Sequence, residues 1–181
     1  MVQIFSQAFS FPHEWSKVVS GVWQKYPNPA TAHVISVDTI GRTVDPATGV
    51  VRTERVIGCK QSAPRWAIKM LGGTEDAYVR EVSFVDPVSQ KMTMFSVNLS
   101  LSQYLTVLES ITYSPSHSSP KSSTLFSQTA EISARGSLWK SVADKLETVS
   151  LERFVANAAL GKEGFEGVLS KLWEKKDTES S

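Results

Sequence analysis

Cysteine and histidine are scarce in this 181-residue sequence, which contains one cysteine, Cys59, and three histidines. A single cysteine excludes an internal disulfide and a cysteine-based zinc site. No run approaches the roughly 18 apolar residues that a membrane-spanning helix needs. The N-terminus lacks the charged region of a secretory signal and the arginine-rich, amphipathic pattern of a mitochondrial transit peptide. The composition therefore gives no sign of a disulfide scaffold, a zinc site or a membrane span.

An excess of charge of either sign is also missing, because the formal net charge is +1. This balance excludes the strongly basic domains that bind nucleic acids through their bulk charge. Apolar residues make up 41% of the sequence and charged residues 20%, as in ordinary folded domains. We expect one domain over residues 1–176, large enough to bury its own core, and a short tail at 177–181.

Signatures of catalysis are missing as well, since the sequence has no GxSxG, HExxH or GxGxxG motif. Gly161-Lys162 is not part of a phosphate-binding loop, because Ala156 occupies the place of that motif's first glycine. The three histidines are scattered and indicate neither a cysteine–histidine nucleophile nor a metal site. We expect a protein that is not an enzyme and that uses no cofactor or metal.

The periodicity of apolar residues predicts an α+β fold with an antiparallel sheet and helices on one side of it. The predicted strands are 2–11, 33–44, 49–60, 78–86, 91–101, 104–113 and 124–134. A first helix is expected after Pro12, because apolar residues recur at helical spacing from Trp15 to Trp23, and it must end before Pro27. A long helical stretch follows at 137–175. Its apolar phase slips near Ser150 and three later glycines weaken it, so we expect a bend or two consecutive helices.

The segment 61–73 is apolar where a connection between strands is usually polar. Pro64 and the Gly72-Gly73 pair separate it from the strands on either side. Between them lies one short helical stretch whose residues are Arg65, Trp66, Ala67, Ile68, Lys69, Met70 and Leu71. Three interpretations are open: a short helix packed on the core, a lid over a cavity, or a segment that dips into a bilayer.

Charged side chains fall on apolar strand faces, because alternate residues of a strand share a face. Arg55 lies in a row with Thr53 and Ile57. A buried guanidinium is costly without an anionic partner. That partner is either an internal carboxylate, from Glu81 or Glu109, or the phosphate or carboxylate of a ligand, which matches the forked donors of arginine.

Other strands repeat this pattern of polar groups on an apolar face. Glu109 shares a face with Val107 and Ile111, and Gln128 lies between two apolar neighbours on its own face. His33 heads a predicted inward row with Ile35 and Val37, where a lone histidine is more often an ordinary core residue. Together these residues predict an internal cavity that is partly polar.

The same residues lie in motifs that resemble the PRELI-like family, and more closely its Slowmo branch. The match runs from residue 1 to about 174. The motifs that carry it are Tyr26-Pro27-Asn28-Pro29, 33–38 (HVISVD), 53–55 (TER), 60–74 (KQ…PRW…MLGGT), 79–83 (VREVS), 112–115 (TYSP), 124–126 (TLF) and 134–137 (ARGS).

This resemblance implies a curved antiparallel sheet of about seven strands that wraps around a long C-terminal helix and encloses one phospholipid, a helix-grip or START-like fold. It implies residence in the mitochondrial intermembrane space and a heterodimer with a small helical-hairpin protein that has twin CX9C motifs. By the family pattern, the residues near the head group and the cavity mouth are Lys25, His33, Arg55, Arg153 and Asn157, and we add Glu109 from its place on the inward face.

The function that the resemblance implies is transfer of a phospholipid, with phosphatidylserine favoured for the Slowmo branch, between the outer and inner mitochondrial membranes. Segment 61–73 would gate the cavity and contact anionic membranes through its apolar residues, Arg65 and Lys69. Three alternatives stay open. They are transfer of phosphatidic acid as in the PRELI branch, a module that binds or senses lipid without moving it, and an enzyme of helix-grip architecture such as a cyclase or hydratase.

Overall fold

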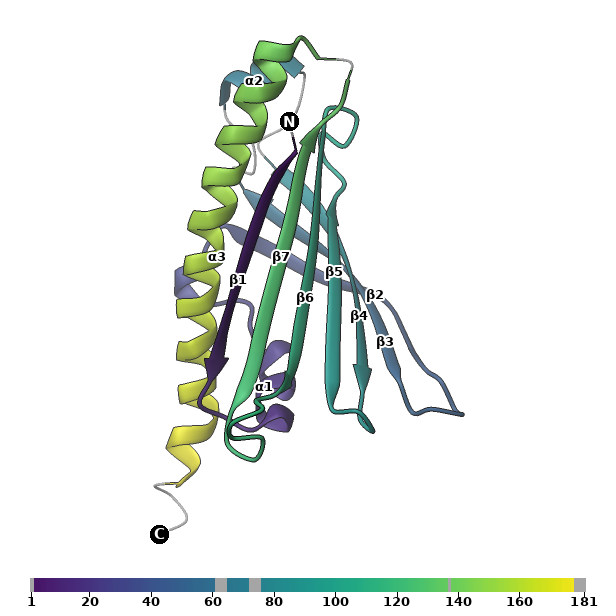
Figure 1. Ribbon diagram of the computed structural model, residues 1–181, viewed down its shortest axis with the longest axis vertical. Coiled ribbons are helices and arrows are strands. Elements are labelled where there is room, and N and C mark those ends of the chain that lie inside the picture. Colours follow the sequence, from purple (N-terminus) through teal and green to yellow (C-terminus); the bar gives the residue numbers. More distant parts are fainter. Residues whose placement is uncertain (1, 61–64, 72–75, 137, 178–181) are drawn as a thin grey trace.

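A computed structural model describes residues 2–60, 65–71, 76–136 and 138–177. Within these ranges the chain forms a seven-stranded antiparallel sheet and a long C-terminal helix that lies along its concave face (Figure 1). The expected α+β class and sheet are therefore confirmed. The strands are β1 (Gln3–Phe11), β2 (Val34–Val44), β3 (Val51–Lys60), β4 (Asp76–Asp86), β5 (Lys91–Asn98), β6 (Leu105–Pro115) and β7 (Thr124–Ala134).

The strand order is β1-β7-β6-β5-β4-β3-β2, so neighbours in sequence pair from β2 to β7 and β1 joins the far edge beside β7. The connection from β1 to β2 must therefore cross from one edge of the sheet to the other. It contains helix α1 (Trp15–Val22) and the short 3₁₀ helix η1 (Pro29–Thr31). This crossing places the residues between α1 and η1 under the concave face.

Helix α1 buries the residues that its sequence spacing predicts. Trp15, Val18, Val19 and Val22 are buried, and the Trp15 indole N–H donates a 3.2 Å hydrogen bond to the backbone carbonyl of Tyr113 on β6. The apolar stripe therefore faces the sheet, as expected for an amphipathic helix.

The C-terminal helix α3 (Lys140–Asp177) is continuous over 38 residues, so the predicted bend or break is wrong. At 1.5 Å per residue it is about 57 Å long. Gly164 does not interrupt the helix, and close packing explains why a glycine is present there. A Cβ atom at this position would lie 2.4 Å from Oδ1 of Asn28, so glycine lets α3 pack closely against the connection before η1.

One predicted strand row is wrong in its first half. His33 and Val34 both line the interior, whereas Ile35 is 45% exposed on the outside. The pairing of β2 with β3 shifts register between Val34 and Ser36. A bulge of this kind interrupts the alternation of faces, which explains why the expected row of His33, Ile35 and Val37 does not form.

Buried apolar side chains gather in two clusters. The larger one, which we call the aromatic cluster, joins α1 to the sheet and α3, and its rings are Phe11, Tyr113, Phe126 and Phe165. The smaller one, which we call the upper cluster, consists of Leu105, Ile132 and Leu146. The aromatic cluster lies near the C-terminal half of α3 and the upper cluster near its beginning, beside helix α2 (Arg65–Leu71) (Figure 1).

Candidate functional site

A cavity of about 210 Å³ lies between the concave face of the sheet and α3. Every strand contributes to its lining, together with α1, η1 and the residues from Phe154 to Phe165 of α3. Most of the lining side chains are apolar, and the polar ones come mainly from the middle of the sheet. The structure therefore confirms that the interior contains a partly polar cavity.

The polar lining follows from strand register. Arg55 on β3 pairs with Glu81 on β4, Glu81 pairs with Ser96 on β5, and Ser96 pairs with Glu109 on β6. Directly paired residues of neighbouring strands point to the same face. Arg55, Glu81, Ser96 and Glu109 therefore form one row across four strands, which we call the polar row.

Arg55 forms an internal ion pair, which is the first of the two alternatives that the sequence left open. Its Nε and Nη2 donate hydrogen bonds of 2.8 and 2.6 Å to the same carboxylate oxygen of Glu81. The guanidinium also lies 5.2 Å from the ring of Trp23. Burial raises the pKa of Glu81, and the attraction of Arg55 opposes that rise. Most of the charge of Arg55 is thus balanced within the protein.

Glu109 is held by hydrogen bonds from two directions. The Ser96 hydroxyl donates a 2.7 Å hydrogen bond to Oε2, and the amide nitrogen of Gln128 on β7 donates to Oε1. Gln7 on β1 donates in turn to the amide oxygen of Gln128. This chain of donors fixes the Glu109 carboxylate against the wall of the cavity.

Lys25 reaches the cavity from the connection between α1 and η1. Among the described residues its ammonium has no carboxylate partner, and it lies 5.4 Å from the ring of Tyr26 and 5.8 Å from that of Phe165. Burial alone would lower the pKa of Lys25, yet the ionisable groups around it raise that pKa above its ordinary value. Those groups are Tyr26, Tyr113, Glu109 and Glu81. Lys25 therefore stays charged at neutral pH.

His33 is the other predicted head-group residue on this side of the cavity. It is half-buried just before β2, and burial lowers the pKa of its imidazole below the ordinary value. The neutral imidazole is thus the prevailing form at neutral pH. It offers one donor and one acceptor rather than a charge.

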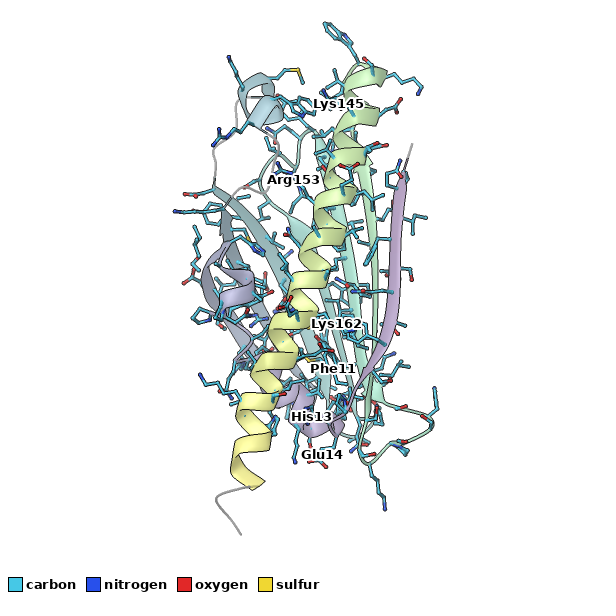
Figure 2. The ribbon with its side chains drawn as sticks, turned by 90° about the vertical axis from the view of Figure 1, so that its left-hand side faces the viewer. Phe11, His13, Glu14, Lys145, Arg153 and Lys162 are labelled. Atoms are coloured by element: carbon cyan, nitrogen blue, oxygen red, sulfur yellow. The ribbon has the colours of Figure 1, made fainter. Side chains whose placement is uncertain are left out.

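Five of the six predicted lipid-binding residues line this one cavity. They are Lys25, His33, Arg55, Glu109 and Asn157, of which Asn157 is exposed on α3. Arg153 lies on α3 at about the midpoint between Lys145 and Lys162 and is not among the lining residues (Figure 2). The sequence interpretation missed Ser96 and Gln7 and considered Glu81 only as a partner of Arg55. Alternation along the strands could have identified all three residues as lining the cavity, since each lies on the inward face of its strand.

The apolar segment forms a helix, as predicted, and α2 lies beside the beginning of α3 (Figure 1). Trp66 packs on the upper cluster, and Lys145 of α3 lies 5.0 Å from its ring. Arg65, Lys69 and Met70 are exposed. Pro64, 61–63 and Gly72-Gly73 lie outside the described residues, as do the side chains of Ile68 and Leu71. None of the four described α2 side chains lines the cavity.

Two features are absent from the described part of the chain. Within these ranges no helix is long and apolar enough to cross a membrane. In the same part of the chain, no three histidine, cysteine or acidic side chains come together as a metal site would require.

Sequence comparison places the chain among known proteins. Residues 16–176 match the profile of the PRELI-like family. The chain is 42% identical over 177 residues to Protein UPS2, mitochondrial, of Saccharomyces cerevisiae, covering 96% of this chain and 76% of that protein. It is 41% identical to the UPS-like protein C36.10 of Schizosaccharomyces pombe (94% and 91% covered) and 34% identical to the Protein slowmo homolog of Dictyostelium discoideum (95% and 72% covered).

Solved structures with the same architecture share little sequence with this chain. An aromatase/cyclase from Streptomyces, Zhui, superimposes with a TM-score of 0.62 at 9% identity, over 94% of this chain and 95% of that one. A START superfamily protein from Mycobacterium smegmatis gives a TM-score of 0.50 at 13% identity, over 93% and 98%. These matches establish the helix-grip fold and nothing about activity.

Proposed function

The chain belongs to the PRELI-like family, and from this premise we propose that it carries single phospholipid molecules between mitochondrial membranes. The cargo we propose is phosphatidylserine, moved between the outer and inner membranes through the intermembrane space. No bond is made or broken in this mechanism. The observation that carries the proposal is Lys25, a half-buried lysine that lines a mostly apolar cavity and whose ammonium has no carboxylate partner among the described residues.

A cavity of this kind lowers the barrier that keeps phospholipids in a bilayer. Each methylene group costs about 0.8 kcal/mol to expose to water, so two acyl chains leave the membrane slowly without a carrier. The apolar walls replace the bilayer interior, and Lys25 supplies the positive charge that a buried phosphate requires.

The size of the cavity defines what must move. The cavity of about 210 Å³ is smaller than the roughly 300–1,000 Å³ of pockets that bury a drug-sized ligand, and a phospholipid with two acyl chains is larger than such a ligand. This volume accommodates a head group but not two acyl chains. We propose that the chains extend toward the upper cluster and that α2 moves aside to make room, so that α2 acts as the lid over the cavity.

Membrane contact fits the same end of the molecule. Met70 of α2 is 52% exposed, and Trp139, immediately before α3, is 84% exposed. Arg65 and Lys69 of α2 are exposed and lie close to Met70 in sequence. Exposed apolar side chains among basic ones suit an anionic membrane surface, into which the apolar groups insert. Trp66, by contrast, packs inward on the upper cluster.

The outer face of the sheet suits the proposed partner. Ile4, Phe95 and Leu108 are between 47% and 74% exposed there and border a hollow of about 490 Å³, with Arg80 and Glu131 at its margins. Exposed apolar patches of this kind mark interaction sites. We propose that the small twin-CX9C helical-hairpin protein packs on this face to form a heterodimer, leaving the cavity on the other face free.

The function is tested by lipid transfer between donor and acceptor liposomes. We expect wild-type protein to move phosphatidylserine, and Lys25→Met to reduce its rate about tenfold, because the buried phosphate loses a charge-assisted partner. Lys171→Met, which removes an exposed lysine of α3, is the matched control and should transfer normally. Retention of lipid without transfer would support a sensing module instead. A rate higher for phosphatidic acid than for phosphatidylserine would support the alternative cargo, and a chemically altered lipid would reveal an enzyme.

A further inference from the structure

The charged groups of the cavity divide into those that have an ion-pair partner and two that have none among the described residues. Arg55 and Glu81 bind each other directly, with both guanidinium contacts on one carboxylate oxygen. Lys25 and Glu109 line the same cavity but form no ion pair with each other or, within the described ranges, with any other residue. Lys162 of α3 also lines the cavity, but its ammonium lies 3.7 Å from the carboxylate of Glu166. Among the described lining residues, the charges left without an ion-pair partner are therefore those of Lys25 and Glu109.

Glu109 is prepared to accept further hydrogen bonds. Ser96 and Gln128 each donate to one of its two oxygens, while a carboxylate has about four acceptor sites. The two existing donors are neutral, so they hold the carboxylate in place without cancelling its charge. A group with several N–H donors and a positive charge is the natural complement of such an acceptor.

We infer that the cavity recognises a phospholipid head group with a primary ammonium, with its phosphate at Lys25 and its ammonium at Glu109. This inference rests on the proposed function and adds its selectivity. A primary ammonium offers three N–H donors to Glu109, whereas a quaternary ammonium offers none. Phosphatidic acid has no cation at all and would leave Glu109 facing a phosphate, which is unfavourable in a site of limited volume.

Glu81 does not serve equally well for this role. Its carboxylate already contacts two guanidinium nitrogens, and removing it would leave Arg55 buried without a partner. Glu109 is not needed to balance a buried positive charge, since its hydrogen-bond donors are a hydroxyl and an amide, which can pair with a neutral side chain instead. The ammonium site is therefore assigned to Glu109, and Ser96 acts as a positioning residue.

The test compares Glu109→Gln with wild type in a competition for lipid. The protein is incubated with liposomes that contain equal amounts of phosphatidylserine, phosphatidylethanolamine, phosphatidylcholine and phosphatidic acid, and native mass spectrometry identifies the retained species. Wild type should retain the two lipids with primary amines. Glu109→Gln preserves the shape and the acceptor oxygen, and should lower the ratio of phosphatidylserine to phosphatidic acid about tenfold or more. Glu163→Gln, which changes an exposed glutamate of α3 that does not line the cavity, should leave that ratio unchanged.

A smaller effect is expected for Ser96→Ala, which removes one of the two donors that orient Glu109 and should shift the ratio in the same direction by a fewfold. An unchanged ratio in Glu109→Gln overturns the inference while leaving lipid transfer intact. An equal loss of all four lipids in that variant also overturns it, because Glu109 would then serve the fold rather than selection. Wild-type protein that retains and transfers none of the four lipids would overturn the proposed function itself.

Discussion

The two ends of the space beneath α3 are closed in different ways. At the α1 end, the rings of Phe11, Tyr113, Phe126 and Phe165 meet edge to face or stacked, with centroids 5.2 to 6.5 Å apart, and α1 covers them. At the α2 end, the three buried residues of the upper cluster carry a seven-residue helix. We therefore expect a lipid to enter at the thinly covered α2 end, where fewer core contacts must be broken. The polar row lies between them.

The largest loss of stability should follow from removing a ring at the packed α1 end. Phe165→Ala removes a fully buried ring of the aromatic cluster and should lower the free energy of unfolding by about 3–5 kcal/mol. Leu146→Ala, in the upper cluster, should cost closer to 2 kcal/mol, because neighbours there can collapse more easily. Urea denaturation of both variants measures the difference. Equal losses would remove the distinction between the ends.

The next largest effect is expected at Gly164, where the backbone of α3 packs closely against the side chain of Asn28. Gly164→Ala forces a methyl group against Asn28 and should destabilise the protein by roughly 1–3 kcal/mol. Gly167→Ala is the matched control, because a Cβ atom there meets nothing within 4 Å. It should stabilise the helix by up to about 1 kcal/mol. The two melting temperatures should therefore move in opposite directions. A shared direction would show that Gly164 is not a site of close packing.

At the thinly covered end, the expected effect is on transfer rather than on stability. Met70→Ser combined with Trp139→Ser removes two exposed apolar side chains and should slow transfer roughly fivefold with an unchanged free energy of unfolding. The control is Val88→Ser, which changes a side chain that is 84% exposed in the turn after β4. Liposome co-sedimentation separates membrane binding from later steps. Normal sedimentation of the double variant would place membrane contact elsewhere.

The smallest effect concerns pH. Burial lowers the pKa of His33, so the folded protein favours the neutral imidazole. Its contribution to stability is present above the unfolded pKa, near 6.5, and is lost as the pH falls through the lower folded value. Wild type should therefore lose slightly more stability between pH 7.5 and 5.5 than His33→Gln does. Identical pH profiles would mean that burial of the imidazole has no energetic consequence.

Local patterns predicted most of the fold. Alternation located all seven strands within a few residues, and helical spacing located α1 and its buried face. Two features depended on contacts distant in sequence. The bulge near Val34 arises in the pairing of β2 with β3, and the continuity of α3 through Gly164 depends on Asn28 lying close by.

The candidate site was predictable in its members but not in their pairing. Alternation identified Arg55 and Glu109 as charges on an inward face. The register of the strands places Arg55 opposite Glu81, and it places Ser96 between the carboxylates of Glu81 and Glu109. Register depends on the lengths and geometry of the three connections between these four strands, which a single strand does not encode. Lys25 had no local signal, because it lies in an irregular connection, and only the family pattern indicated it.

The central claim is that opposite charges of the cavity hold the two ends of a phospholipid head group. A crystal structure of the protein with bound phosphatidylserine tests it most directly. We expect the phosphate within hydrogen-bonding distance of the Lys25 ammonium and the serine ammonium on the Glu109 carboxylate. A phosphate bound at the cavity mouth beside Arg153, with Lys25 making no contact to the lipid, would contradict it.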